Sequence, residues 1–417
     1  MITRGVVLIV AALAIVTGAA VDWSLHAGET PRAGSPSPAS GSPLPSGASP
    51  PADIELPADT ILAWTVGGLP PGFAAAVRRL PGVVHVVVVS SGTAQLSRTL
   101  AAGGAVVSKP PAGMFIPVEV ASADPAALAP FWPARLRPDL TALAHGQALL
   151  GTTSAAIRHL GRGGELVFSP PSGTASTFPL RVGGVVPDAA VGAAEVFVGP
   201  RAAVALEVTR RRYLLVDPGG AVPAELVERG IRSVLPAGAL LRLRTRSQTP
   251  FLRQGDAVLA PVMVKKLFGE FAADPTANAG GWFTMSPAWA RRHIVTAAVP
   301  ILGRVTCNRR IIPQLRAALE EVQARGLANL IDPGDYGGCY TPRLLSAADP
   351  SAGPSHHAWG IAIDINVSRN PFGGTPTQDP RIVAIFRRWG FTWGGRWLFP
   401  DGMHFEAKRV VAAPGGR

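Results

Sequence analysis

The first large part of the chain, residues 54–261, is a series of short apolar runs separated by glycine and proline. Pro71–Leu80 has a helical pattern, and the β-branched run Val83–Val89, which follows a Pro-Gly pair, predicts a strand. The same order recurs where a helical pattern over Pro223–Ser233 precedes the alternating run Ala239–Thr245. These runs predict an α+β domain of unknown role and allow for two related α–β units. Further short strands are predicted at Glu165–Phe168, Leu180–Val186 and Glu195–Val198.

The composition changes near residues 263–281, and a second domain is predicted over residues 262–417. Its clearest helix is Arg309–Arg325, in which apolar side chains recur along one stripe and Gly326 ends the pattern. Ser286 stands before a proline and is predicted to be the N-cap of another helix. The apolar stripe consists of Ile312, Leu315, Leu319 and Val322.

Two short segments near the C-terminus alternate apolar and polar residues, a pattern typical of strands with one buried face. In residues 361–366 the isoleucines lie on one face, and Asp364 lies on the other beside an alanine that leaves room for an ion. In residues 403–406, His404 and Glu406 share a face. We expect both segments to be strands whose apolar faces enter a core.

Asp401 lies in a Pro-Asp-Gly turn three residues before His404. In a straight strand the two side chains would face opposite sides, but a turn can bring the carboxylate over a metal bound to His404. With His357 and Asp364, these residues supply two imidazoles, a carboxylate and a spare carboxylate, the inventory of a catalytic zinc site with an open position for water. Taken alone, Asp364 also fits a buried structural carboxylate and Asp401 an ordinary turn. The combination predicts a metal-dependent hydrolase.

The N-terminus has the pattern of an export signal. Arg4 precedes an uncharged apolar run that ends before Asp22, a length at the lower limit for crossing a bilayer. We expect residues 1–27 to be either an uncleaved single-pass signal anchor or a signal peptide with a cleavage site near residues 18–20. The Pro/Ser/Gly-rich residues 28–53 are predicted to be a disordered linker.

The length of 417 residues favours two folded domains with appendages. The net charge of +12, carried almost wholly by arginine, favours polyanionic partners. Because the chain is expected to be exported, nucleic acid is excluded as a partner. Anionic cell-wall polymers and, through the N-terminal segment, the membrane remain as expected partners.

The chain has two cysteines, Cys307 and Cys339, and they lack the spacing of a metal-binding pair. In an oxidising compartment an even pair predicts a disulfide. Three histidines of the first domain stand alone in the sequence and are predicted to be structural. They are His85, His145 and His159.

The C-terminal motifs resemble the M15 family of zinc D-Ala-D-Ala carboxypeptidases and L-Ala-D-Glu endopeptidases, the VanY-like or LAS peptidases. Their likeness covers about residues 290–410 and leaves residues 54–261 without a counterpart. The family pattern Ser-x-His-x-x-Gly-x-Ala-x-Asp is matched at Ser355, His357, Gly360, Ala362 and Asp364, and the closing Asp-x-x-His at Asp401 and His404. Residues 390–397 resemble the Gly-Phe-x-Trp-Gly-Gly-x-Trp stretch of the endopeptidase-like branch, and residues 338–343 resemble the family's arginine-bearing segment.

This resemblance implies a LAS-type domain, a small antiparallel sheet with flanking helices, that holds one Zn²⁺ per chain. His357, Asp364 and His404 would be the metal ligands, Asp401 the general base, and Arg343 the residue that polarises the scissile carbonyl. His356 is the rival ligand to His357, but the seven-residue step to Asp364 fits only His357. His356 is therefore expected in an outer-shell or surface role.

The leading hypothesis is an extracytoplasmic zinc metallopeptidase that hydrolyses peptidoglycan stem peptides and is anchored in the bacterial cell membrane or secreted to the wall. Both a D-Ala-D-Ala carboxypeptidase and an L-Ala-D-Glu endopeptidase stay open. A non-catalytic wall-binding protein is one alternative. Another is a membrane-tethered assembly or signalling protein in which residues 54–261 do the work.

Overall fold

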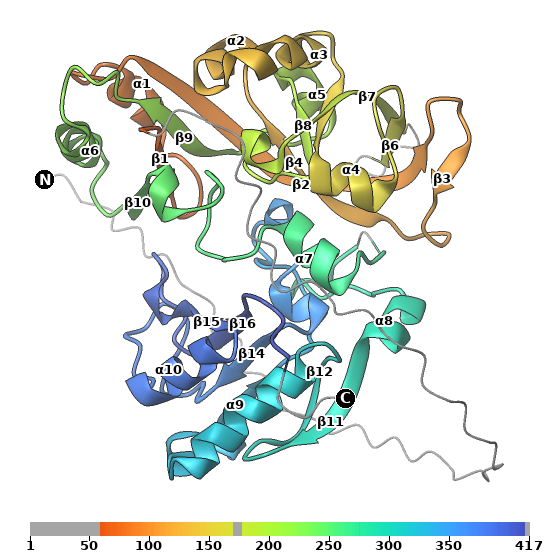
Figure 1. Ribbon diagram of the computed structural model, residues 1–417, viewed down its shortest axis with the longest axis vertical. Coiled ribbons are helices and arrows are strands. Elements are labelled where there is room, and N and C mark those ends of the chain that lie inside the picture. The colour runs from red at the N-terminus through yellow and green to blue at the C-terminus, as the bar shows by residue number, and fades with distance from the viewer. Residues whose placement is uncertain (1–58, 170–176, 275, 413–417) are drawn as a thin grey trace, which may run out of the picture. The chain divides into compact units, whose positions relative to one another are not determined.

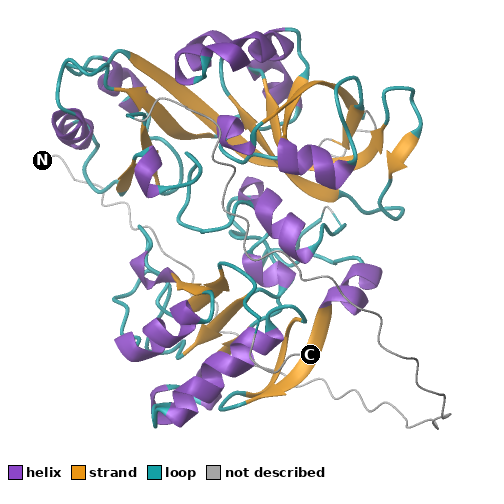
Figure 2. Ribbon diagram, in the orientation of Figure 1, coloured by secondary structure: helices purple, strands orange, loops and turns teal. Residues whose placement is uncertain are grey.

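The computed structural model describes residues 59–169, 177–274 and 276–412. The predicted signal segment and the Pro/Ser/Gly-rich linker lie outside these residues. Within the described ranges, no helix is both long enough and apolar enough to cross a membrane. Helices and strands are mixed throughout the described chain (Figure 2), which confirms the α+β class.

The N-terminal part is a barrel-like α+β domain. Its organising element is the sixteen-residue strand β2, His85–Leu100. Its first half pairs with β9 and its middle with β4, and its last residues pair with β6. That last pairing closes a ring in the order β2-β4-β8-β5-β7-β6. All of these strands except β5 are labelled in Figure 1. The other strands of this ring are β4 Ile116–Ser122, β5 Ala148–Gly151, β6 Glu165–Ser169, β7 Phe178–Val186 and β8 Val196–Val198.

Strand β2 is longer than predicted. The sequence pattern indicated a strand only over Val83–Val89, because the polar stretch Ser90–Gly92 interrupts the apolar run. In the structure this stretch pairs with β4, and Ser90 also pairs with β9. Hydrogen bonding along the edges of the strand satisfies its backbone, so the strand continues without an apolar side chain at each alternate position.

A four-stranded wing extends from the barrel in the order β10-β1-β9-β2, with all neighbours antiparallel. Its chain order β1-α1-β2 and β9-α6-β10 contains two β–α–β units, so the two predicted α–β pairs lie in one sheet. Helices α1 and α6 share one apolar cluster with this sheet. The bounds are β1 Ile61–Thr65, α1 Phe73–Arg78, β9 Arg211–Asp217, α6 Ala224–Ser233 and β10 Leu241–Arg244.

The remaining elements of this domain are short. β3 pairs with the end of β2, helices α2 to α4 connect strands of the ring, and α5 leads from β8 to β9 of the wing. They are β3 Val106–Ser108, α2 Pro125–Leu128, α3 Leu140–Ala144, α4 Thr152–Arg158 and α5 Pro200–Ala205.

The C-terminal part contains a four-stranded antiparallel sheet in the order β13-β14-β16-β15 and a separate hairpin, β11-β12. Helices α9 and α10 pack against this sheet and hairpin in one apolar core. The predicted stripe of α9 is buried there, and the helix ends before Gly326 as expected. The elements are α7 Pro261–Phe268, α8 Pro287–His293, β11 Ile294–Val299, β12 Gly303–Asn308, α9 Ile312–Ala324, β13 Tyr336–Gly338, β14 Ala362–Ile365, α10 Pro380–Arg388, β15 Phe391–Trp393 and β16 His404–Ala407.

One predicted cap differs from the structure. Ser286 occupies the N-cap position of α8, but its side chain makes no capping hydrogen bond. Ser286 instead donates its backbone N–H to Ala272 and is buried. The proline after it still begins the helix, as its restricted φ angle favours.

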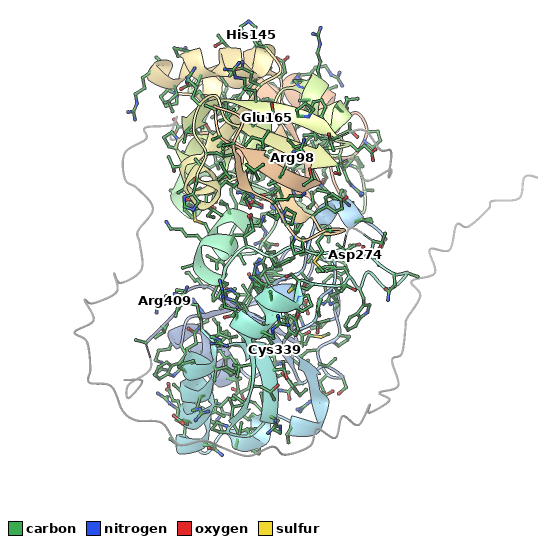
Figure 3. The ribbon with its side chains drawn as sticks, turned by 90° about the vertical axis from the view of Figure 1, so that its right-hand side faces the viewer. Arg98, His145, Glu165, Asp274, Cys339 and Arg409 are labelled. Carbon is green, nitrogen blue, oxygen red and sulfur yellow. A yellow bond between two sulfur atoms is a disulfide. The ribbon has the colours of Figure 1, made fainter. Side chains whose placement is uncertain are left out.

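The predicted disulfide is present and joins Cys307 of β12 to Cys339, which directly follows β13 (Figure 3). Their Cα atoms are 5.4 Å apart, and both residues are buried in the C-terminal core. Closing a loop across a separation of 32 residues stabilises the fold by about 3–4 kcal/mol in the chain-entropy model. The link fixes Cys339 and, as described below, a backbone oxygen that orients a histidine.

Candidate metal centre

Three side chains that the sequence pattern singled out converge at one point in the C-terminal domain. Strand β14 is the neighbour of β16 (Figure 1), and Asp364 on β14 is directly opposite His404 on β16. His357 comes from the short 3₁₀ helix His356–Trp359 that precedes β14. One donor atom from each of the three lies within 4.8 Å of the others, and they form the one such group found in the described ranges.

The spacing of the donor atoms suits a tetrahedral metal. His357 Nε2 lies 3.2 Å from His404 Nδ1 and 3.2 Å from Asp364 Oδ2. His404 Nδ1 lies 3.1 Å from Asp364 Oδ1. Zinc bonds nitrogen and oxygen ligands at about 2.0–2.1 Å, so ligands in a tetrahedron are roughly 3.3 Å apart. The residues present therefore fit a zinc ion with three protein ligands.

Outer hydrogen bonds select the nitrogen that each imidazole presents. His357 Nδ1 lies 2.9 Å from the carbonyl oxygen of Cys339, which can only accept, so the proton is on Nδ1 and Nε2 is free. His404 Nε2 lies 3.3 Å from a carboxylate oxygen of Glu406, which leaves Nδ1 free in the same way. Such partners hold ring orientation and raise ligand basicity in metal sites.

The alternating pattern of residues 403–406 predicts that Glu406 shares a face with His404 and indicates no role for it. The structure buries Glu406, and its Oε2 also lies 2.7 Å from His356 Nδ1. His356 is therefore not in the donor group but is one step removed from it, consistent with the expected outer-shell position. Trp397, the last residue of the Gly-Phe-x-Trp-Gly-Gly-x-Trp stretch, has its ring centroid 5.1 Å from that of His404.

The electrostatics of the cluster favour a cation. Burial alone would lower the pKa of His404, but the carboxylates of Asp364 and Glu406 raise it from 6.5 to about 10. Burial would raise the pKa of Asp364, but the two imidazoles outweigh it and hold that pKa well below its ordinary value. Both directions indicate that these carboxylates stabilise positive charge between them.

Asp401 lies beside this group without belonging to it. Burial raises the pKa of Asp401, the charge of Asp364 adds to the rise, and His404, His357 and Arg343 oppose it. Its Oδ1 atom is buried and has no hydrogen-bond partner in the described part of the chain. A buried carboxylate oxygen without a partner is unusual and fits a group that meets a bound water or substrate.

The turn that carries Asp401 is closed by backbone hydrogen bonds. The Asp401 N–H donates to Gly394 O at 3.0 Å, and the His404 N–H donates to Asp401 O at 3.3 Å. A Cβ atom at Gly394 would lie 2.7 Å from Asp401 O, so the glycine allows this close approach. The Gly-Gly motif thus has a physical reason that the sequence alone did not show.

Arg343 lies near enough to Asp401 to lower the pKa of that carboxyl. Its backbone oxygen accepts the N–H of Ser355 at 3.0 Å, which ties it to the segment that carries His357. The structure therefore brings together all five predicted site residues, while the roles of these residues stay predictions. Within the described ranges, His85, His145 and His159 are not part of a comparable group.

A comparison with known protein families gives a match that covers the predicted metal ligands. Residues 349–407 match the model of an M15 peptidase family described as D-alanyl-D-alanine carboxypeptidase. This match supports a C-terminal domain of the M15 peptidase family, whose members are typically zinc-dependent. The matched stretch contains the three donor residues and Asp401.

Other comparisons add little. No curated protein matches the chain. A solved structure, the periplasmic region of MacB from Actinobacillus actinomycetemcomitans, is 10% identical and has a TM-score of 0.31. The alignment covers 46% of this chain and 91% of that one. A score at this level supports no conclusion about the barrel-like domain.

Proposed function

We propose that this chain is a zinc metallopeptidase that hydrolyses peptide bonds of peptidoglycan stem peptides outside the cytoplasm. The observation that carries the proposal is the group His357, Asp364 and His404 with the unpartnered carboxylate of Asp401 beside it. The family match over the same residues supports a peptidase.

The proposed roles of the residues are inferred from their positions. His357 Nε2, His404 Nδ1 and an oxygen of Asp364 would hold the zinc ion. When bound, zinc acts as a Lewis acid and brings the pKa of its water from 15.7 to about 7. Asp401 accepts a proton from the attacking water and returns it to the nitrogen of the leaving amine. The guanidinium of Arg343 stabilises the negative charge that develops on the carbonyl oxygen, an effect often worth about 3 kcal/mol.

The proposal includes two candidate bonds, the terminal D-Ala-D-Ala bond and the L-Ala-D-Glu bond. Defined muropeptides incubated with the zinc-loaded protein, followed by mass analysis of the products, test it directly. Loss of a terminal D-Ala assigns a carboxypeptidase, and separation of L-Ala from D-Glu assigns an endopeptidase. A zinc-loaded protein that binds wall fragments and cleaves none of these bonds would replace the proposal with the wall-binding alternative.

We also propose the cellular context. Residues 1–27 would export the chain as an anchor or a removed signal, residues 28–53 would be a spacer, and the net charge of +12 would favour anionic wall polymers. The domain boundary near residues 261 and 262 is likewise a proposal. Cell fractionation with N-terminal sequencing of the mature protein tests the location, and a cytoplasmic protein with an intact N-terminus would contradict it.

A further inference from the structure

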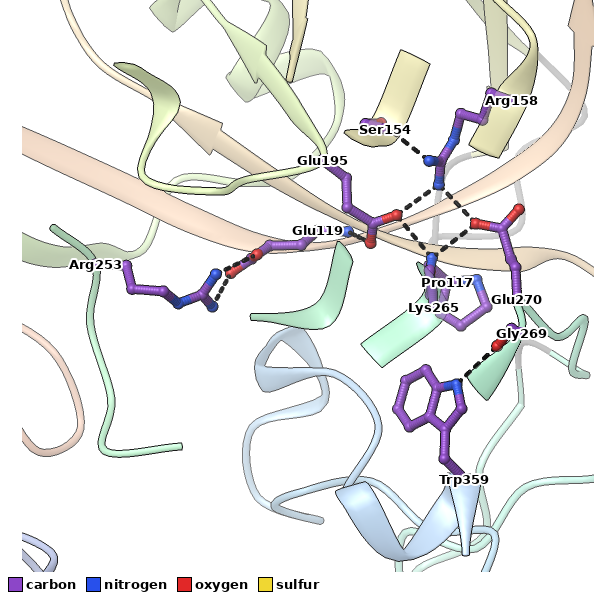
Figure 4. A network of polar contacts seen from close by, with 10 residues as sticks. All are labelled: Pro117, Glu119, Ser154, Arg158, Glu195, Arg253, Lys265, Gly269, Glu270 and Trp359. Carbon is purple, nitrogen blue, oxygen red and sulfur yellow. Dashed lines mark hydrogen bonds and ion pairs between the residues drawn. The ribbon is translucent and has the colours of Figure 1, made fainter. Parts of the chain in front are cut away.

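The segment of residues 253–270, here called the connecting segment, joins the barrel-like domain to the C-terminal domain. Two of its residues are anchored in the barrel-like domain (Figure 4). Arg253 forms two hydrogen bonds with Glu119 of β4, at 2.8 and 3.1 Å. Lys265 lies 2.9 Å from the fully buried Glu195, which also accepts the N–H of Glu119. These two ion pairs are largely shielded from solvent and hold the connecting segment against the barrel-like domain.

The same segment contacts the outer shell of the metal centre. The Val258 N–H donates to Glu406 Oε1 at 3.2 Å, while Glu406 Oε2 contacts His404. Farther along, Gly269 O accepts the indole N–H of Trp359 at 3.1 Å (Figure 4). Trp359 ends the short helix that presents His357.

Asp256 makes a third contact, with the loop 394–401 that leads to Asp401. One carboxylate oxygen of Asp256 accepts the N–H of Leu398 at 2.5 Å. The other is held by Arg242, at 3.0 Å, and by Arg244, both from β10 of the barrel-like domain. The Asp256 side chain is only 6% exposed, so its charge depends on these partners.

The loop is attached to the barrel-like domain by two further contacts. Arg242 donates to the backbone oxygen of Arg396 at 3.3 Å. The Leu398 side chain packs against the apolar core of the barrel-like domain, while Leu259 of the connecting segment packs against the C-terminal core. Leu398 of the C-terminal domain thus contacts the barrel-like core, and Leu259 of the connecting segment contacts the C-terminal core.

We propose that Asp256 is a positioning residue that, through Leu398, sets the loop 394–401 and with it the carboxylate of Asp401. The barrel-like domain then helps to position the carboxylate beside the metal centre. This inference rests on the proposed peptidase function for its kinetic consequence. Small displacements of a catalytic group reduce turnover by about 10²-fold, so the contact matters for kcat more than for substrate binding.

The test uses the full chain, loaded with zinc, and the variant Asp256→Ala. We expect kcat to fall about 10- to 100-fold with KM and zinc content nearly unchanged. Amide hydrogen exchange of residues 394–401, followed by mass spectrometry, should become faster. Asp256→Asn keeps an oxygen for the Leu398 N–H and should recover most of the kcat.

A matched control separates positioning from general loss of stability. Asp188 is also a buried carboxylate that accepts a backbone N–H, from Thr153 at 3.0 Å, inside the barrel-like domain. Asp188→Ala should leave kcat and the exchange of residues 394–401 unchanged. Should Asp256→Ala fail to fold, Arg242→Met weakens the same contacts from a side chain that is 30% exposed, and a smaller effect in the same direction is expected.

Two results would overturn the inference. One is Asp256→Ala with unchanged kcat and unchanged exchange of residues 394–401, and the other is an equal loss in Asp188→Ala. A wild-type protein that cleaves no stem peptide would reject the proposed function instead. Hydrogen exchange, which needs no activity, would then decide alone whether Asp256 holds the loop.

Discussion

Among the residues that the structure describes, the cluster around Glu195 and the metal centre both contain buried ionisable side chains, and they are built differently. In the first, Arg158 and Lys265 face Glu195 and Glu270, with distances of 2.6–3.0 Å (Figure 4). Each charged group there has a partner of opposite charge. In the metal centre, three carboxylates face imidazoles that are neutral unless protonated, and Asp401 has a buried oxygen without a partner. The carboxylates there are Asp364, Asp401 and Glu406.

The difference indicates what each cluster does. Two positive and two negative side chains neutralise one another, so the first cluster is complete and acts in the structure of the fold. The second has negative charge in excess and donor atoms aimed at a common point, so it is complete only with a cation. A buried charge cluster alone is therefore a weak sign of function, whereas its charge balance distinguishes a structural cluster from a site.

Removing a donor should have the largest effect. His404→Ala takes away one of three ligands, so we expect zinc content and peptidase activity to be lost together. Metal analysis of the purified protein and muropeptide cleavage measure both. His356→Ala is the control, because it removes a histidine next to His357 that is not one of the three donors, and this variant should keep the zinc. Full zinc occupancy in His404→Ala would contradict the ligand assignment.

Removing the unpartnered carboxylate should separate catalysis from metal binding. Asp401→Ala leaves the three donors in place, so zinc content should stay at the parental level. Turnover should fall about 10²–10⁴-fold, because general acid–base assistance is lost. Parental turnover in this variant would remove Asp401 from the mechanism.

The paired cluster should respond in stability alone. Arg158→Met leaves Glu195 and Glu270 short of a positive partner in a site where both members of the Arg158–Glu195 pair are at most 1% exposed. We expect the free energy of unfolding to drop by about 3–5 kcal/mol in urea titrations. The folded fraction should still bind zinc fully.

The matched control is an exposed ion pair. Arg162 lies 3.4 Å from Asp139 and is 73% exposed, so Arg162→Met should change the free energy of unfolding by at most about 1 kcal/mol. Equal effects of the two arginine variants would mean that the buried cluster is not a structural centre.

Local patterns account for the parts of the structure that the sequence predicted. The alternation in residues 361–366 and 403–406 predicted two strands with Asp364 and His404 on their polar faces, because side-chain direction depends on strand periodicity, while the pairing of these strands appears only in the structure. The stripe of α9 follows from helical periodicity in the same way. The disulfide followed from an even number of cysteines and expected export.

The parts that could not be predicted depend on contacts between distant residues. Nothing in Ser90–Gly92 indicates that a strand continues through it, because the reason is pairing with strands far away in the sequence. The contact of Asp256 with Leu398 spans 142 residues, and that of Val258 with Glu406 spans 148. Such contacts leave no periodic signal, so the attachment of the metal centre to the barrel-like domain appears only in the folded chain.

The smallest expected effect is the release of a proton on zinc binding, which tests the charge excess of the metal centre. The pKa of His404 is raised to about 10, so at about pH 8 the ring in the metal-free site is an imidazolium, with a proton on each nitrogen. Zinc needs the Nδ1 lone pair while Nε2 keeps its proton toward Glu406, so binding should release about one proton. Below the raised pKa, apparent zinc affinity should therefore increase about tenfold per pH unit. The stability of the metal-free fold changes in the opposite direction: the raised pKa stabilises this fold below the ordinary value of 6.5, and the contribution disappears as the pH rises through about 10. Calorimetry of zinc binding in buffers with different ionisation enthalpies counts the protons.

Glu406→Gln removes one of the carboxylates that raise the pKa of His404, so fewer protons should be released near pH 8. Binding enthalpies that do not depend on the buffer would show that the metal-free site carries no such proton and that its carboxylates do not create the excess of negative charge argued above.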